Sequence, residues 1–223
     1  MKLAIFDVDG TLVDSVALLV ESVTACFIAL DHPVPDEPAM RAISGLNLEL
    51  GMEILAPNAD AGLLAALAAQ YRHEYLSRAT ADMREPLFPG TEAVLDLLAA
   101  REDMHLAVAT GKALRGANRI LGAHDIARYF ANVQTPDHNA SKPHPQMIYS
   151  AMSAVGVDKE NTVMIGDTNH DMEMARAAGV RAIGVSWGYH LPADLTKAGA
   201  DIIIDDYADL IGAIDSLLGT SNA

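Results

Sequence analysis

The chain has 223 residues, of which 51% are apolar, and its 30 acidic and 15 basic residues give a formal charge of −15. A chain of this size can bury a core in one large domain or in a domain with an insertion. Its strong negative charge disfavours nucleic acid and anionic membrane surfaces as partners. The single cysteine, Cys26, cannot form an internal disulfide, which fits a cytoplasmic protein. No apolar stretch is long enough to predict a membrane span.

Five short apolar runs are predicted to be buried strands, at residues 2–6, 105–110, 161–167, 181–187 and 200–205. They are rich in Val and Ile and do not alternate with polar residues, as expected for parallel strands covered on both faces. Helical patterns separate them, and two of these patterns close on a predicted glycine cap, at Gly122 and Gly179. The alternation predicts an α/β fold with a doubly wound, Rossmann-like parallel sheet of five or six strands.

Residues 16–86 contain no strand pattern. Two long helical stretches, 16–30 and 61–78, are separated by breaks such as the proline-rich segment 32–38. We therefore expect a core made of residues 1–15 and 87–223, with residues 16–86 inserted as an all-helical second domain. The two crossings between them lie close together in this scheme, which is typical of a hinge.

Polar side chains follow the predicted strands at the edge of the sheet where ligands bind in folds of this class. They are Asp7 and Asp9 after the first strand, Thr110, Gly111 and Lys112 after the second, Lys142 before the helix at 145–156, and Asp167 and Asp171 after the third strand. We expect these groups to lie close together.

Crowded carboxylates need a partner of opposite charge. Two like charges about 4 Å apart repel by roughly 4 kcal/mol at an effective dielectric near 20. Asp7, Asp9 and Asp167 would therefore either take up protons or bind a cation. Few protein carboxylates with open positions suit Mg²⁺, which can also bind a phosphate oxygen. Lys142 adds a positive charge for the same phosphate.

The spacing of Asp7 and Asp9 suits two different tasks. One carboxylate can attack phosphorus and form an aspartyl-phosphate. The other can protonate the departing alkoxide and later deprotonate water. Gly10 lets the backbone turn away after them, while the Thr110 hydroxyl and the Gly111 amide can bond a phosphoryl oxygen.

Four segments in order resemble the motifs of the haloacid dehalogenase superfamily. They are DVDGTLVD at 7–14, AVATG at 107–111, Lys142-Pro143, and GDTNHD at 166–171. The resemblance implies a phosphatase with Asp7 as nucleophile and Asp9 as general acid and base. It also implies Mg²⁺ held by Asp7, the Asp9 carbonyl and Asp167, with Asp171 supporting the metal directly or through water and orienting Lys142. The helical insertion resembles the C1 cap of this superfamily.

Details within the superfamily narrow the function. Asp9 argues against the metal-free dehalogenases and the phosphonate hydrolases, and residues 16–86 contain no lysine for a Schiff base. The chain is most similar to the phosphoglycolate phosphatase-like subgroup, which also includes pyrophosphatases and sugar-phosphate phosphatases. Residues 40–55 resemble the Arg-x-x-x-Gly loop of that subgroup, which makes Arg41 and Asn47 candidates for substrate contact.

Other polar residues have simpler interpretations. Asp14 is predicted to cap the first inserted helix, and Cys26 to lie in the core of the insertion. Lys112 either contacts the substrate or is a solvated lysine. Trp187 and Tyr189 either border the pocket or pack at a strand end. No paired histidine spacing indicates a transition-metal site.

The sequence therefore predicts a Mg²⁺-dependent phosphatase that hydrolyses a small phosphorylated metabolite, either phosphoglycolate-like or a sugar phosphate, through an aspartyl-phosphate. Three alternatives stay open: a phosphomutase of the β-phosphoglucomutase type, an inorganic pyrophosphatase, and a non-enzymatic phosphate or partner sensor. Sequence patterns do not choose between a monomer and a homodimer.

Overall fold

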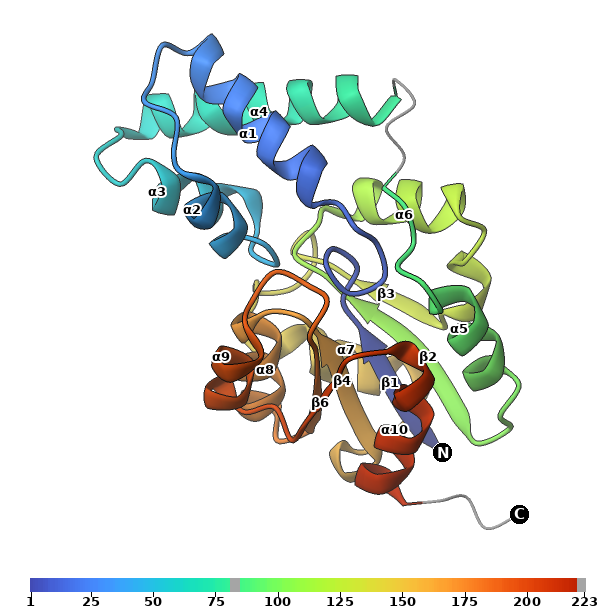
Figure 1. Ribbon diagram of the computed structural model, residues 1–223. Helices are drawn as coiled ribbons and strands as arrows, with labels where there is room; N and C mark the ends of the chain where they lie inside the picture. Colours follow the sequence, from blue (N-terminus) through green and yellow to red (C-terminus); the bar gives the residue numbers. More distant parts are fainter. Residues whose placement is uncertain (81–84, 220–223) are drawn as a thin grey trace.

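A computed structural model describes residues 1–80 and 85–219 (Figure 1). The strands are β1 Lys2–Phe6, β2 Met104–Ala109, β3 Asn132–Gln134, β4 Thr162–Gly166, β5 Arg181–Val185 and β6 Ile202–Ile204. The α-helices are α1 Val16–Ala29, α2 Glu37–Ala42, α3 Leu48–Leu55, α4 Ala61–Thr80, α5 Thr91–Ala99, α6 Leu114–Ala123, α7 Gln146–Val155, α8 Asn169–Ala178, α9 Pro192–Ala198 and α10 Leu210–Leu218. Short 3-10 helices lie at Ala127–Tyr129, Lys159–Asn161 and Tyr207–Asp209.

The six strands form one parallel sheet in the order β3-β2-β1-β4-β5-β6. The predicted α/β doubly wound fold is thus confirmed, and β1 lies at its centre between β2 and β4. The strand patterns predicted by sequence omitted β3, which has only three residues, two of them polar (Asn132 and Gln134) and all half-buried. A strand this short and polar leaves no apolar pattern to detect.

Helices cover both faces of the sheet and divide the side chains of β1 between two cores. Ala4 and Phe6 pack with residues of α5, α6 and α10 on one face. Leu3 and Ile5 pack with residues of α7, α8 and α9 on the other. All five residues of β1 are buried. This two-sided burial explains why the strands are apolar throughout rather than alternating.

Glycine ends one helix as predicted and fails to end another. Gly179 has a left-handed backbone (φ 73°) and caps α8. Gly122, by contrast, lies inside α6, which continues to Ala123 and ends at His124, so its prediction as a cap is wrong. The left-handed residue after α6 is Asp125 (φ 56°), a residue type that tolerates this conformation better than most.

Helices α1 to α4 pack together around a third core, separate from those of the sheet, with Phe27, Met52 and Leu67 at its centre. Figure 1 shows these helices above the sheet. The segment that leads into these helices and the segment that returns from them lie side by side, since the Asp14 N–H donates to the Pro86 carbonyl at 2.8 Å. Part of the predicted second domain, residues 81–84, lies outside the described residues, and the division at 16–86 stays a prediction.

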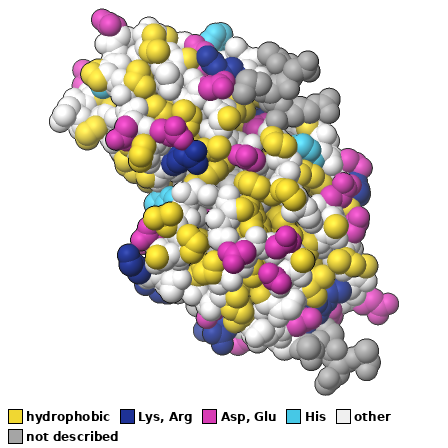
Figure 2. All heavy atoms as spheres, viewed as in Figure 1, with side chains coloured by type: hydrophobic (Ala, Val, Ile, Leu, Met, Phe, Trp, Pro, Cys, Tyr) yellow, Lys and Arg dark blue, Asp and Glu magenta, His cyan; other side chains and the backbone are white. Residues whose placement is uncertain are grey.

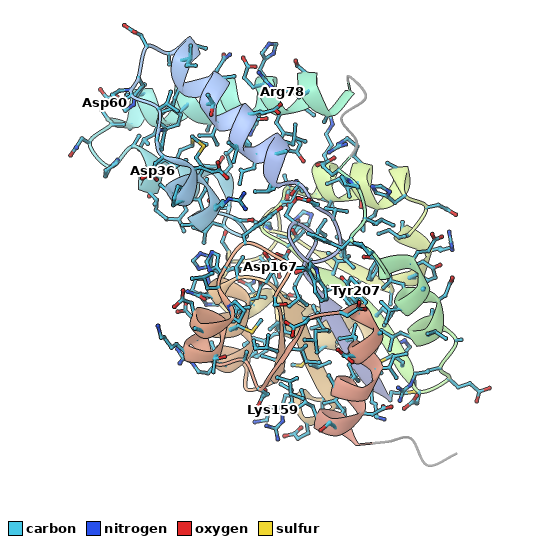
Figure 3. The ribbon with its side chains drawn as sticks, in the orientation of Figure 1. Asp36, Asp60, Arg78, Lys159, Asp167 and Tyr207 are labelled. Atoms are coloured by element: carbon cyan, nitrogen blue, oxygen red, sulfur yellow. The ribbon has the colours of Figure 1, made fainter. Side chains whose placement is uncertain are left out.

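The helical unit lies over the carboxyl ends of the strands. In Figure 3, Asp167, just after β4, lies at the side of the sheet facing the helices α1 to α4, and Lys159, before β4, lies at the opposite end.

Acidic side chains are spread over the face shown in Figure 2, in keeping with the excess of Asp and Glu. Among the described residues, none of the helices meets the length and hydropathy needed to cross a bilayer.

The environment of Cys26 predicts an unreactive thiol. Cys26 is fully buried in the helical unit, and its Sγ donates to the Leu67 carbonyl at 3.1 Å. Burial raises the pKa of this thiol to about 11, so that very little reactive thiolate exists at pH 8. We expect iodoacetamide to leave the folded protein unmodified at pH 8 and to label it after unfolding in urea, as measured by mass spectrometry. Equal labelling rates for folded and unfolded protein would contradict this burial.

Candidate active site

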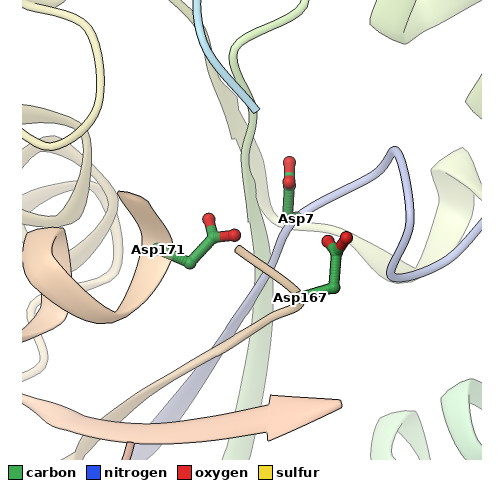
Figure 4. Close-up of side chains that lie close together, drawn as sticks. All are labelled: Asp7, Asp167 and Asp171. Atoms are coloured by element: carbon green, nitrogen blue, oxygen red, sulfur yellow. The ribbon is translucent and has the colours of Figure 1, made fainter. Parts of the chain in front are cut away.

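Three buried carboxylates converge at the carboxyl edge of the sheet. Asp7 follows β1, Asp167 follows β4, and Asp171 lies in the first turn of α8. All three are 0% exposed, and one oxygen from each lies within 4.8 Å of the others (Figure 4). Among the described residues this is the only group of three or more His, Cys, Asp or Glu side chains placed to hold a metal ion.

One ammonium group is buried against this cluster. Lys142 Nζ lies 2.9 Å from Asp7 Oδ1 and 2.6 Å from Asp171 Oδ1, with all three side chains fully buried. Burial alone would lower the pKa of Lys142, but the carboxylates of Asp171 and Asp7 raise it above its ordinary value. Lys142 therefore stays charged and joins two carboxylates that would otherwise repel each other.

The charge balance of the cluster fits a divalent cation. Burial raises the pKa of Asp7, an effect that Lys142 only partly offsets, and burial together with the neighbouring carboxylates raises the pKa of Asp167 well above its usual range. Asp7 Oδ2 has no hydrogen-bond partner in the part of the chain that the structure describes. Carboxylate oxygens with a free position are the ligands that Mg²⁺ prefers.

Asp167 is held in place from two directions. Thr11 Oγ1 donates to Asp167 Oδ1 at 2.9 Å, and the Tyr189 N–H donates to Oδ2 at 3.0 Å. The backbone carbonyl of Thr11 in turn accepts hydrogen bonds from Trp187 Nε1 (3.2 Å) and the Tyr207 hydroxyl (2.7 Å). Trp187 thus has the packing role that was one of its two sequence interpretations.

Asp171 uses both of its oxygens within the protein. Its Oδ2 accepts from the Thr168 N–H at 3.1 Å and from the Thr168 hydroxyl at 2.6 Å. The Asp171 N–H donates back to the Thr168 hydroxyl oxygen at 3.3 Å, which completes a capping box at the start of α8. Its Oδ1 faces Lys142. The helix start thereby fixes the carboxylate that orients the ammonium group.

Asp9 lies beside the buried cluster and is partly accessible. The Ser15 hydroxyl donates to Asp9 Oδ1 at 2.5 Å and lies 2.8 Å from the Tyr189 hydroxyl. Lys112 Nζ lies 3.1 Å from Asp9 Oδ2. Both oxygens of Asp9 therefore have a partner, and the side chain remains 18% exposed.

The loop at Gly45 and Leu46 of the helical unit contacts the segment that follows β2. Thr110, 1% exposed, accepts the Lys112 N–H on its Oγ1 at 3.3 Å. At Gly111 an added Cβ would lie 2.3 Å from the Gly45 carbonyl oxygen. Only a residue without a side chain fits this close approach of two backbones. The structure therefore brings the helical unit into direct contact with the predicted phosphate-binding segment.

A cavity of about 720 Å³ lies between the helical unit and the sheet. Asp9, Gly111, Lys112 and Asn47 line it, together with Tyr71, Tyr75 and several leucines. The cavity reaches the accessible carboxylate of Asp9, and the buried carboxylates lie deeper at the same edge of the sheet.

The two residues proposed from the Arg-x-x-x-Gly resemblance have different positions. Asn47 lines the cavity, and its Nδ2 donates to the Ser141 hydroxyl at 2.6 Å, next to Lys142. Arg41 does not line the cavity, because its guanidinium pairs with Glu37 at 2.7 Å on the exposed side of α2. The structure gives no support to a substrate contact by Arg41.

Several partners of the site were not identified from the sequence. Ser15 adjoins the first motif and is itself the N-cap residue of α1, so the prediction that Asp14 caps this helix is wrong, although Asp14 Oδ1 accepts from the Val16 N–H at 3.3 Å. Tyr75 and Glu85 lie outside all motifs, and only tertiary structure brings them near Lys112. A helical pattern shows that Tyr75 lies on a helix but not what it faces.

Comparison with known proteins gives the chain its family. The model of the haloacid dehalogenase-like hydrolase family matches residues 4–185. The chain belongs to this family. It is 38% identical to the "Probable phosphatase IndB" of Dickeya dadantii (strain 3937), over 99% of this chain and 96% of the relative. It is 29% identical to a phosphoglycolate phosphatase of Photorhabdus laumondii, over 94% of this chain and 90% of the relative.

Solved structures agree with this assignment. A haloacid dehalogenase-like family hydrolase from Streptococcus pneumoniae superposes with a TM-score of 0.83 at 26% identity, covering 96% of this chain and 98% of that one. The family predicted from the four motifs is confirmed, and so is the class of enzyme, a phosphatase of the phosphoglycolate phosphatase-like group.

Gly10 offers a test of the carboxylate cluster. Gly10 has φ +79°, and an added Cβ would lie 2.1 Å from Asp167 Oδ2. We expect Gly10→Ala to lower phosphatase activity by roughly 10- to 100-fold, as displacing the support of a metal ligand does, and to destabilise the fold by about 1–3 kcal/mol.

Gly122→Ala is the matched control, since a Cβ at this helical position would have no atom of the other described residues within 4 Å beyond its own helix backbone and chain neighbours. It should leave activity unchanged and keep stability within about 1 kcal/mol. The measurements are phosphate release and thermal denaturation. An active Gly10→Ala variant would show that Asp167 is not held where the structure has it.

Proposed function

We propose that the protein is a Mg²⁺-dependent phosphatase that hydrolyses a small phosphomonoester through an aspartyl-phosphate on Asp7. In this proposal residues 16–86 act as a cap over the core formed by 1–15 and 87–223, and the enzyme works in the cytoplasm. The observation that carries the proposal is the buried Asp7 carboxylate. One of its oxygens faces Lys142 and the other is unpartnered among the described residues.

Asp7, Asp167 and the backbone carbonyl of Asp9 would hold the magnesium ion. When bound there, the ion would neutralise the carboxylates and polarise a phosphoryl oxygen. Asp171 supports the site from outside, because Thr168 and Lys142 already occupy its two oxygens. This arrangement favours the orienting role of Asp171 over direct ligation.

The side chains divide the reaction between them. Asp7 attacks the phosphorus atom, and the bond to the leaving oxygen breaks as the Asp7–phosphorus bond forms. Lys142, the Thr110 hydroxyl and the Gly111 N–H stabilise charge on the transferred group. Asp9 donates a proton to the leaving oxygen and then removes one from the water that hydrolyses the aspartyl-phosphate.

The cavity supports a substrate larger than phosphoglycolate. Its volume of about 720 Å³ lies within the range of about 300–1,000 Å³ that accommodates drug-sized ligands, far more than a two-carbon acid needs. Its wall carries charges of both signs and many polar groups, among them Arg115, Asn47 and Asp137. A sugar phosphate fits this space better than phosphoglycolate does, and we propose that class of substrate.

The nucleophile can be tested by substitution. For Asp7→Asn we expect no turnover and no phosphoenzyme. For Asp9→Asn we expect turnover of p-nitrophenyl phosphate to fall by roughly 10²–10⁴, with the phosphoenzyme persisting, because Asp9 activates the water of the second step. Acid-quenched samples analysed by mass spectrometry report the phosphoenzyme. Phosphate trapped on Asp7→Asn, or unchanged turnover of Asp9→Asn, would show that the roles are assigned wrongly.

A substrate and metal screen tests the remaining alternatives. We expect Mg²⁺-dependent phosphate release from sugar phosphates, little release from pyrophosphate, and loss of activity in excess EDTA that added Mg²⁺ restores. Conversion of glucose 1-phosphate to glucose 6-phosphate without phosphate release would indicate a phosphomutase. Inactivity on every phosphoester, with and without Mg²⁺, would favour a non-enzymatic sensor.

A further inference from the structure

Lys112 makes two contacts that belong to different parts of the molecule. Its ammonium group lies 3.1 Å from Asp9 Oδ2 in the core, and it donates to the Tyr75 hydroxyl of α4 at 2.9 Å. The ammonium also lies over the ring of Tyr75, 4.7 Å from its centroid. Gly116 leaves room for the stem of Lys112, because a Cβ there would come within 3.0 Å of the Lys112 Cγ.

Tyr75 is itself held by a buried acid. The Tyr75 hydroxyl donates to Glu85 Oε1, and Arg119 Nη2 donates to both Glu85 oxygens, at 3.0 and 2.9 Å. Glu85 is only 4% exposed, and its backbone carbonyl lies 2.6 Å from His124 Nε2. Glu85 therefore links the segment that follows the helical unit to α6, and its side chain accepts a hydrogen bond from the Tyr75 hydroxyl of α4.

The direction of these hydrogen bonds is fixed by charge. Burial raises the pKa of Tyr75 to about 12, so the phenol is neutral at pH 7. Its proton points to Glu85, which leaves its oxygen to accept from Lys112. One continuous set of contacts thus joins the core to the helical unit, with the neutral Tyr75 hydroxyl between the ion pairs Asp9–Lys112 and Glu85–Arg119.

We propose that Lys112 is a positioning residue for Asp9, and that Tyr75 completes this arrangement only while the helical unit lies against the core. The inference rests on the proposed function, since it gives Asp9 its acid and base roles. Lys112 then acts on the reaction through the orientation of Asp9, whereas a substrate-binding lysine would act through affinity. Contact with the helical unit thereby fixes the orientation of the Asp9 carboxylate.

Two substrates with different leaving groups test the positioning role, and kcat at saturating glucose 6-phosphate separates it from affinity, because loss of a binding contact raises KM and leaves kcat unchanged. p-Nitrophenolate leaves without being protonated, so the first step with p-nitrophenyl phosphate does not need Asp9. The alkoxide of glucose 6-phosphate does need a proton donor. Because kcat/KM reports the steps up to the first irreversible one, a misplaced Asp9 lowers kcat/KM for glucose 6-phosphate and spares that for p-nitrophenyl phosphate.

We expect Lys112→Met to lower kcat/KM for glucose 6-phosphate by roughly tenfold or more beyond any loss with p-nitrophenyl phosphate. Tyr75→Phe should shift the same ratio in the same direction, because it removes only the hydroxyl and keeps the ring beneath Lys112. Lys112→Arg should restore part of the ratio. Thermal denaturation checks that each variant is folded, and Tyr75→Phe alone decides the matter if Lys112→Met does not fold.

Lys159→Met is the matched control, since Lys159 is an exposed lysine at the end of the sheet opposite the cavity. It should change both values of kcat/KM by the same factor. An equal change for both substrates in Lys112→Met and Tyr75→Phe, or none in either variant, would overturn the inference.

The proposed function fails by a different result. If wild-type protein hydrolyses neither ester, or if Asp9→Asn does not itself show the selective loss with glucose 6-phosphate, then Asp9 is not the proton donor. If Asp9→Asn shows the selective loss and the Lys112 and Tyr75 variants do not, only the positioning role is wrong.

Discussion

The ion pairs of Lys142 with Asp7 and Asp171 are the interaction on which the rest of the site depends. Three carboxylates with no access to solvent repel one another strongly in a low-dielectric interior. One ammonium group, fully buried between two of them, balances part of that charge and leaves a net negative cluster. The remaining imbalance suits a cation, which is the basis of the proposed metal and phosphoryl site.

Glycines and hydrogen-bond donors around the cluster make it possible to bury three carboxylates so close together. Gly10 and Gly188 each lie so close to Asp167 that an added Cβ would approach within 2.1 Å of its side chain. Thr11 and the Tyr189 N–H then fix the direction of the carboxylate. Glycines leave space for the Asp167 carboxylate, and neighbouring hydrogen-bond donors fix its orientation.

The predictable part of the site is the part encoded by short segments at strand ends. Asp7, Asp9, Lys142 and Asp167 each lie within or beside a compact motif, and the parallel sheet brings those motifs together without further information. The partners of Asp9 could not be predicted in this way. Tyr75 lies 66 residues after Asp9 along the chain, and its neighbour Glu85 follows ten residues later. Such contacts depend on how the helical unit meets the core, which no local pattern encodes.

The central place of β1 in the sheet has a consequence for how the enzyme withstands local opening. β1 is hydrogen-bonded on both sides, whereas β3 and β6 are edge strands of three residues each. Fraying proceeds from the edges of a sheet, where backbone groups are paired only once. The peptide that carries Asp7 is therefore shielded by its neighbours. Amide hydrogen exchange would reach it late, after the margins of the fold had already exchanged.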